Sequence, residues 1–240
     1  MFVHTFMSIP AGLESYRGNK AIPGLSHWII NHIPAHTVYY EPFCGSAAIA
    51  SMLPARVHKV LNDCDAGVID KINCGFLNGS FTAICGTAVQ LIESILPTAD
   101  TDTFVYMDPP YIIESRKWKK RIYKFEMTVS AHEHLLALAV KAKFNCMISH
   151  YEHPVYDDLL KGWIKAKKKV RYHNSTVQEC IYMNYPIPSV LQSYDKVGIN
   201  CWDRQRIKRK IERLAKKLSA LPDIERNAVI TRVSQLVQIK

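Results

Sequence analysis

Long apolar runs and paired cysteines are both missing from this sequence. No stretch approaches the roughly 18 consecutive apolar residues that a membrane helix needs, and residues 1–6 lack the basic region and apolar core of a secretory leader. The 7 cysteines are odd in number and include no Cys-x-x-Cys pair, which favours reduced thiols over a disulfide framework. We therefore expect a soluble cytoplasmic protein that makes no membrane contact.

Metal-ligand spacing is also missing. The histidines and cysteine at 132, 134, 146, 150 and 153 are close in sequence, but their spacings match no standard zinc site, so we predict no metal. The hydrophobic share of 48% and charged share of 22% are ordinary globular values, which excludes a disordered chain. A length of 240 residues allows one sizeable domain, or one domain with a small appendage.

Positive charge is scarce in the first half of the chain and abundant in the second. Up to Pro110 there are 5 Lys+Arg against 9 Asp+Glu; from Tyr111 onward there are 26 against 12. The two net charges, −4 and +14, account for the +10 of the whole chain. This asymmetry predicts a surface for a polyanion in the second half. A solvated basic face is the alternative that composition leaves open.

Short strands that alternate with helical stretches indicate an α/β domain with a largely parallel sheet. The expected strands are Thr37–Glu41, Val57–Leu61, Phe81–Ile84, Thr103–Met107 and Phe144–Ser149. Two further strands, Lys169–His173 and Glu179–Tyr185, are separated only by 174–178, which is too short for a parallel crossover. We predict that they form an antiparallel hairpin that finishes the sheet.

The pattern changes after Tyr185. Two prolines, Pro186 and Pro188, break regular structure, and Trp202–Leu218 then shows an apolar stripe at helical spacing among many basic residues. A second helix is expected over Ile224–Val237. We expect residues 1–188 to form the main domain and residues 189–240 a basic helical extension, whose stripe can pack on that domain or on a second copy in a homodimer.

A small-residue turn follows the first expected strand, in the stretch Glu41–Ile49. Such a turn lets a ligand approach the backbone and the positive end of the next helix. Asp63 lies 18 residues beyond Gly45, close to where a nucleotide-binding fold places an acid on the ribose hydroxyls. A purely structural turn remains an open alternative at this point.

A sharper motif, Asp108-Pro109-Pro110-Tyr111, follows the apolar strand Thr103–Met107. This position places a carboxylate at the ligand-binding edge of the sheet. Two successive prolines stiffen the backbone, so that carbonyl acceptors point in a fixed direction. Two acceptors and an adjacent aromatic ring suit an exocyclic amino group on a flat base.

With these motifs the sequence resembles the amino-type S-adenosylmethionine-dependent DNA methyltransferases that act on adenine N6, and within them small phage-like relatives of the Dam enzymes. The resemblance implies a Rossmann-like methyltransferase fold and a protein of a bacterial cell or a phage-infected host. It implies transfer of methyl from S-adenosylmethionine to the N6 of an adenine flipped out of the DNA, with S-adenosylhomocysteine as product. Solitary modification, a restriction partner and a phage device all stay open.

The family's motifs transfer onto this chain residue by residue. The catalytic signature falls on Asp108, Pro109, Pro110 and Tyr111. Pro109 and Asp108 would accept the amino hydrogens while Tyr111 stacks on the base. The implied cofactor-binding residues are Tyr16, Lys20, Glu41, Pro42, Phe43, Cys44, Gly45, Ser46, Asp63, Asp65 and Asp108.

Double-stranded DNA is the implied partner. Basic residues interleaved with aromatics follow the signature, and two further basic strips lie at the hairpin and in the tail. The expected DNA contacts are Arg116, Lys117, Trp118, Lys119, Lys120, Arg121, Tyr123, Lys124, Lys167, Lys168, Lys169, Arg206, Lys208, Arg209 and Lys210. We expect the first strip, residues 116–124, to order on DNA and to take over part of the target reading.

Three departures from the family pattern bear on activity. Ala47 stands where relatives carry a second glycine, and Thr87 replaces an acid that contacts the cofactor's adenine in many relatives. The interval from Phe43 to Asp108 leaves no room for a separate target-recognition domain. An RNA substrate and an inactive nucleic-acid-binding protein are therefore the alternatives.

Overall fold

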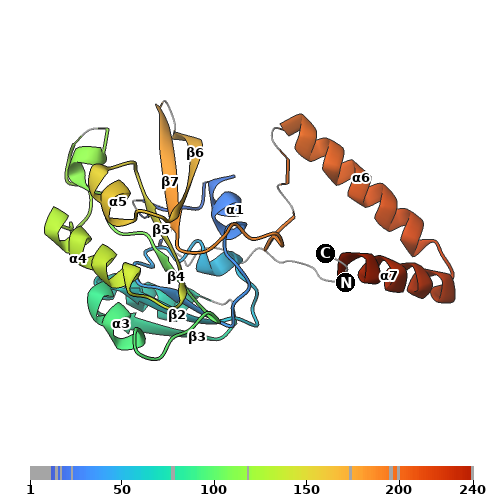
Figure 1. Cartoon of the computed structure of the whole chain (residues 1–240), viewed down its shortest axis with the longest axis horizontal. Helices are drawn as coiled ribbons and strands as arrows, with labels where there is room; N and C mark the ends of the chain where they lie inside the picture. The colour runs from blue at the N-terminus through green and yellow to red at the C-terminus, as the bar shows by residue number, and fades with distance from the viewer. Residues whose placement is uncertain are drawn as a thin grey trace. The chain divides into compact units, whose positions relative to one another are not determined.

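The computed structural model describes residues 12–13, 16, 18–22, 24–76, 79–117, 119–172, 175–194, 197–198 and 201–238 (Figure 1). The chain divides into two compact units, residues 1–193 and residues 194–240. The assignment of residues 1–188 to a methyltransferase domain and of 189–240 to a basic extension stays a prediction.

A seven-stranded sheet forms the first unit, in the order β3-β2-β1-β4-β5-β7-β6. Its strands are β1 (Val38–Glu41), β2 (His58–Asp63), β3 (Phe81–Cys85), β4 (Thr103–Met107), β5 (Asn145–His150), β6 (Ile164–Tyr172) and β7 (Ser175–Met183). The first five pair in parallel, whereas β7 runs antiparallel to both β5 and β6. The expected Rossmann-like methyltransferase topology is confirmed.

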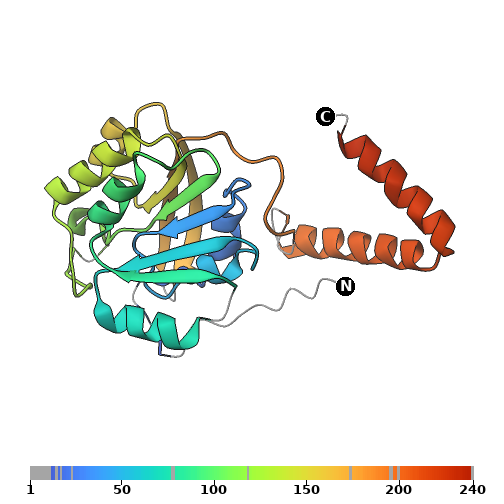
Figure 2. The same ribbon diagram turned by 90° about the horizontal axis from the view of Figure 1, so that it is seen from below.

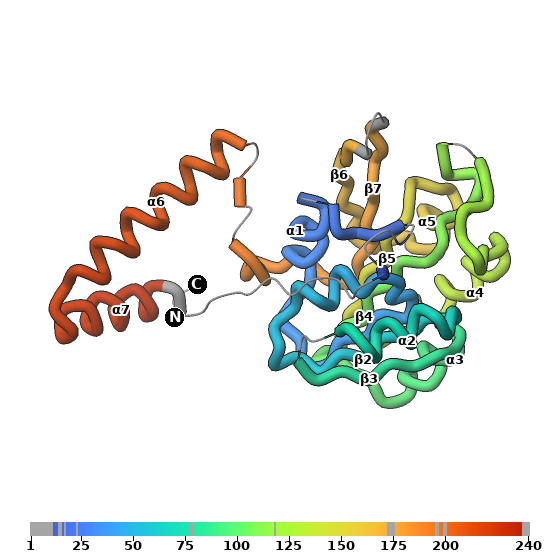
Figure 3. The backbone as a smooth tube through the Cα atoms, turned by 180° about the vertical axis from the view of Figure 1, so that it is seen from behind, coloured from blue at the N-terminus to red at the C-terminus, as the bar shows by residue number. Residues whose placement is uncertain are grey.

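Helices cover both faces of this sheet (Figures 2 and 3). The apolar cluster on one face joins α1 (Leu25–Ile30), the 3-10 turn η1 (Ala50–Met52) and α2 (Ala66–Gly75). The cluster on the other face joins α3 (Ala88–Ile95), α4 (Val129–Val140) and α5 (Pro154–Leu159). Side chains of Asp65, Thr87 and Thr128 cap the first turns of α2, α3 and α4.

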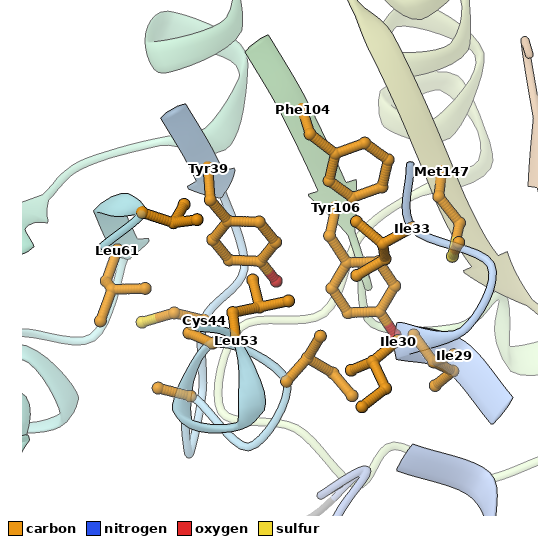
Figure 4. Close-up of a cluster of buried hydrophobic side chains, with 14 of the residues drawn as sticks. Ile29, Ile30, Ile33, Tyr39, Cys44, Leu53, Leu61, Phe104, Tyr106 and Met147 are labelled. Carbon is orange, nitrogen blue, oxygen red and sulfur yellow. The ribbon is translucent and has the colours of Figure 1, made fainter. Parts of the chain in front are cut away.

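The alternation of side chains along the central strands explains why both faces are apolar. In β4, Phe104 and Tyr106 point into the first cluster, while Val105 and Met107 point into the second. Figure 4 shows Phe104 and Tyr106 beside Tyr39 of β1, and the rings of Tyr39 and Phe104 stack at 6.1 Å. A strand buried on both faces reads as a continuous apolar run, as Thr103–Met107 does.

The hairpin is longer than the sequence indicated. The segment 174–178 was expected to connect two strands, but residues 175–178 belong to β7 and pair with 169–172 of β6. The expectation was wrong because polar residues in 175–178 resemble a loop, although paired edge strands expose one face to water. The first strand of the hairpin also begins earlier than expected, at Ile164 instead of Lys169. The remaining strand ends agree with the expected ones to within about two residues.

The order of the strands fixes where a ligand can bind. From β1 the chain proceeds to β2 on one side, and from β4 to β5 on the other, so the topological switch lies between β1 and β4. Ligands of open α/β sheets bind at the carboxyl ends of the strands beside this switch. The glycine turn follows β1 and Asp108 follows β4, which brings both motifs to that edge.

Two helices form the second unit, α6 (Cys201–Ser219) and α7 (Asp223–Gln238), close to the expected ranges. The side chains of Ile211 and Leu214 in the α6 stripe are about half exposed. Dimerisation and the role of this unit stay predictions. Within the described part of the chain, none of the helices has the length and hydropathy of a membrane span.

Candidate functional site

A cavity of about 260 Å³ lies at the carboxyl edge of the sheet. Its wall is formed by the glycine turn, by Asp63 at the end of β2 and Asp65 after it, by Asp108 and Pro110 of the predicted signature, and by a segment that follows the signature. From the predicted cofactor set it is lined by Tyr16, Lys20, Glu41, Pro42, Phe43, Cys44, Gly45, Ser46, Asp63, Asp65 and Asp108. Residues that the prediction missed here include Ile122 and Phe125, which have no motif of their own.

The glycine turn is fixed by its neighbour strand. The Asn62 amide donates to the Pro42 carbonyl at 2.8 Å and to the Gly86 carbonyl at 3.1 Å, so it ties the turn to the loop after β3. Gly45 has φ +46°, and a Cβ there would lie 2.6 Å from the ring of Tyr16. Glycine at this position therefore allows both the backbone conformation and the close approach of Tyr16.

Ala47, the departure from the family pattern, is held in a conformation that glycine prefers. Its φ is +51° and it is fully buried. The left-handed conformation costs an L-residue roughly 1–2 kcal/mol, so the turn keeps its shape but carries backbone strain.

Replacing Ala47 with glycine should consequently leave the free energy of unfolding nearly unchanged. Relief of that strain offsets the loss of a buried methyl, about 0.8 kcal/mol, and the glycine entropy, about 0.5–1 kcal/mol. Ala139→Gly, at a fully buried position within α4, gains no such relief and should cost about 2 kcal/mol. Urea denaturation measures both; equal losses at the two sites would contradict the strain argument.

The acid that ends β2, Asp63, and the acid two residues later, Asp65, occupy different environments. Asp63 accepts hydrogen bonds from the Gly45 N–H at 3.0 Å and the Asp65 N–H at 2.9 Å, and burial raises its pKa. Asp65 caps α2 and forms an ion pair with Lys124 at 3.0 Å. Asp63 thus holds the glycine turn through the Gly45 N–H, while Asp65 links the start of α2 to Lys124 across the cavity.

Asp108 is the buried carboxylate at the centre of the site. Its Oδ2 lies 2.8 Å from Nζ of Lys20, whereas its Oδ1 is buried and accepts no hydrogen bond from the described residues. Burial raises the pKa of Asp108 and the charge of Lys20 lowers it, with a net rise to about 6. The carboxylate therefore keeps an acceptor position that a ligand can use.

Tyr111 contacts residues of β5 and β7 and the residue that follows β5. Its hydroxyl donates to Oε2 of Glu179 at 2.8 Å, and its ring lies against Tyr151 and His150. His150 also accepts the Ile112 N–H at 2.8 Å, which anchors the loop after the signature. The sequence prediction missed these partners because they come from β5 and β7, at long separation from Tyr111.

The position of Arg116 differs from the one predicted for a DNA contact. It was expected on a phosphate-binding surface, but only 7% of its side chain is exposed. Its guanidinium is ion-paired with Glu126 and donates to the carbonyls of Tyr111 and Lys120. Arg116 is therefore a structural cation that links the signature to the segment 120–126, because a buried paired guanidinium cannot reach a phosphate.

The rest of the first basic strip divides into two parts. Tyr123 and Lys124 line the cavity, although 67% of the Lys124 side chain is exposed. Lys117, Lys119, Lys120 and Arg121 are exposed, and Trp118 lies outside the described residues. Among the described residues between 117 and 121, all four cations are thus exposed to solvent.

The other two strips are exposed to different degrees. Lys167 is ion-paired with Glu152 at 2.6 Å, Lys168 lies over the ring of Trp28, and Lys169 is exposed. In α6, Arg206 and Lys208 pair with Asp203 and Glu212 within the helix, and Arg209 and Lys210 are exposed. Among the described residues no cluster of histidine, cysteine and acidic side chains has the arrangement of a metal site.

Comparison with known proteins gives one family match, over part of the chain. The family model of the D12 class N6 adenine-specific DNA methyltransferases matches residues 70–172, a segment that includes Asp108–Tyr111 but not the glycine turn. The matched segment is less than half of the chain. No curated protein matches the chain by sequence.

Similar solved structures are distant. A SAM-dependent methyltransferase from Agrobacterium tumefaciens is 10% identical over 66% of this chain and 58% of its own, with a TM-score of 0.42. The magnesium protoporphyrin IX methyltransferase of Synechocystis PCC 6803, with bound SAM, is 12% identical over 67% and 76%, with a TM-score of 0.43. Precorrin 8W decarboxylase from Methanobacterium thermoautotrophicum is 11% identical over 70% and 92%, also at 0.43. The chain spans less than two thirds of the Agrobacterium protein.

The residues that line the cavity fit S-adenosylmethionine. The cavity combines a tight turn against Tyr16 with the carboxylates of Asp63, Asp65 and Asp108. Carboxylates suit ribose hydroxyls and a positively charged sulfonium, and small residues let the cofactor approach the backbone. Thr87 caps α3 and bonds to Gln90, so its side chain is committed to the helix rather than to the cavity.

Proposed function

We propose that the protein is a DNA adenine-N6 methyltransferase. The single observation that supports this most is Asp108. It is a buried carboxylate whose Oδ1 has no partner among the described residues, and it lines the same cavity as the glycine turn. Asp108 lies within the segment that matches the D12 family. A buried acceptor without a partner is costly, and the amino group of a base would satisfy it.

In the proposed reaction this chain positions and polarises the amino group. S-adenosylmethionine, when bound, supplies an electrophilic methyl group. The adenine nitrogen is a weak nucleophile because its lone pair is delocalised into the ring. Hydrogen bonds from its two protons to Asp108 and to the Pro109 carbonyl favour a tetrahedral nitrogen and stabilise positive charge as it develops. The site would otherwise act by orientation, since no covalent enzyme intermediate is needed.

The exposed basic residues supply the contact with phosphates. Lys117, Lys119, Lys120 and Arg121 follow the signature directly, and the flipped base must enter beside them. We expect that replacing all four with alanine makes the fall of log K with the logarithm of the salt concentration less steep. The magnitude of this negative slope should decrease by about 0.9 for each phosphate that the variant no longer neutralises. Filter binding across a salt series measures it. The matched control replaces the exposed Lys71, Lys141, Lys143 and Lys161; an equal drop there would point to net charge alone.

The test of the proposed function is direct. The protein is incubated with S-adenosylmethionine and unmethylated genomic DNA, and in parallel with single-stranded RNA. The products are digested to nucleosides and analysed by mass spectrometry. We expect N6-methyladenine in the DNA; methylated adenine only in RNA would overturn the DNA assignment, and DNA binding without any methylation would indicate an inactive binding protein.

A further inference from the structure

We propose that Lys20, which the sequence assigned to the cofactor, is a positioning residue of the base site. Its ammonium stands in for the amino group of the target base, holds Asp108 as an ionised acceptor, and yields its place when the base enters. This inference rests on the proposed function and names a step of it that neither the family match nor the cofactor requires.

Two distances place the ammonium where the amino group belongs. Nζ of Lys20 lies 2.8 Å from Asp108 Oδ2 and 4.8 Å from the centroid of the Tyr111 ring. A base that stacks on Tyr111 and donates to Asp108 brings its amino nitrogen to the same carboxylate over the same ring. Only 6% of the Lys20 side chain is exposed, and its ammonium lies over the Tyr111 ring, in the space that a base stacked on this ring needs. The amino group of that base then donates to the open Oδ1 while the ammonium is displaced from Oδ2.

The surroundings of Asp108 explain why a counter-ion is needed. Glu179 of β7 opposes its ionisation. Burial, with Asp108 nearby, raises the pKa of Glu41 of β1 to about 8. The phenols near it are neutral: Tyr106, Tyr111, Tyr123, Tyr151 and Tyr156. Burial opposes the charge on Lys20 too, but Asp108 and Glu179 outweigh it and raise the pKa of Lys20. Lys20 is thus the positive charge that keeps Asp108 usable as an acceptor.

Removing the ammonium should therefore change the titration of Asp108. An opposite charge at this distance lowers a carboxyl pKa by about 1–3, so Lys20→Met is expected to raise the Asp108 pKa from about 6 by that amount. Since the proposed mechanism needs the ionised carboxylate of Asp108 as an acceptor, the acid limb of the pH–rate profile should move upward equally. Lys20→Arg retains a cation and should restore most of the profile, and Lys141→Met, at an exposed position on the surface, should not move it.

The experiment follows the carboxyl carbon of Asp108 by NMR, assigned by its disappearance in Asp108→Asn. This titration needs no turnover, so it stays informative even if no methylated product is ever found. A pKa of Asp108 that is equal in the wild type and Lys20→Met would overturn the counter-ion role.

The displacement step has its own readout. Duplex DNA is added together with S-adenosylhomocysteine, and the Lys20 Nζ resonance is followed, with backbone amides reporting whether DNA binds. We expect the resonance to shift, because the ammonium leaves Asp108. An unchanged resonance on a protein that does bind DNA would overturn the stand-in role.

Discussion

Asp108→Asn should lower the rate of methyl transfer by at least about 10²–10³-fold, the usual loss when one group that stabilises transition-state charge is removed. The asparagine side chain keeps the size of the carboxyl but donates where the amino group needs an acceptor. DNA binding should remain, since the proposed phosphate contacts lie in 117–121. Single-turnover rates and binding curves measure the two effects separately, and full turnover in this variant would exclude the proposed mechanism.

A structural loss must be separated from a chemical one, because Asp108→Asn leaves the buried ammonium of Lys20 without its partner. The double variant Asp108→Asn with Lys20→Met removes both charges. We expect it to recover much of any stability lost by the single variant, since the unpaired buried charge is gone. Its activity should stay low, which assigns the kinetic loss to the missing acceptor.

Glu126→Ala should be the most destabilising surface-loop substitution. Both Glu126 and Arg116 are at least nine-tenths buried, and Glu126 also accepts the N–H groups of Ile122 and Tyr123. Removing one partner of a buried ion pair costs about 3–5 kcal/mol, a large share of the roughly 5–15 kcal/mol that typically stabilises a domain. Chemical denaturation measures the loss; a cost below about 1 kcal/mol would show that the pair is not effectively buried.

The matched control is Glu114→Ala, an exposed acid in the 3-10 turn η2 (Ile113–Ser115), which should stay within about 0.5 kcal/mol of the wild type.

The stabilisation that Glu126 provides should depend on pH. Hydrogen bonds from Arg116 lower the pKa of Glu126 to about 2, below the ordinary 4.5. Its stabilisation is therefore complete above about pH 4.5 and is lost as the pH falls toward 2. In Glu126→Gln, the free energy of unfolding should depend less on pH between about 4.5 and 2.

Arg116 and Tyr123 show why composition alone could not assign the basic strip. As sequence, residues 116–124 are a uniform run of cations and aromatics. In the fold, Arg116 is buried in an ion pair with Glu126, and the ring of Tyr123 lies beside Gly18 and lines the cavity. Which cation of a run is buried depends on where an acid lies in space, and that is set by packing rather than by the run itself.

The sequence by itself determined the strands, because a central parallel strand must be apolar on both faces, and it determined the order of motifs, because each follows a strand end. It therefore placed the glycine turn, Asp63 and Asp108 at one edge. Only the tertiary structure decided that Lys20 pairs with Asp108, that Glu179 and His150 hold the signature, and that Arg116 is internal. These contacts join residues up to 88 positions apart, from Lys20 to Asp108, and such pairings are fixed by three-dimensional packing, which leaves no local pattern in the chain.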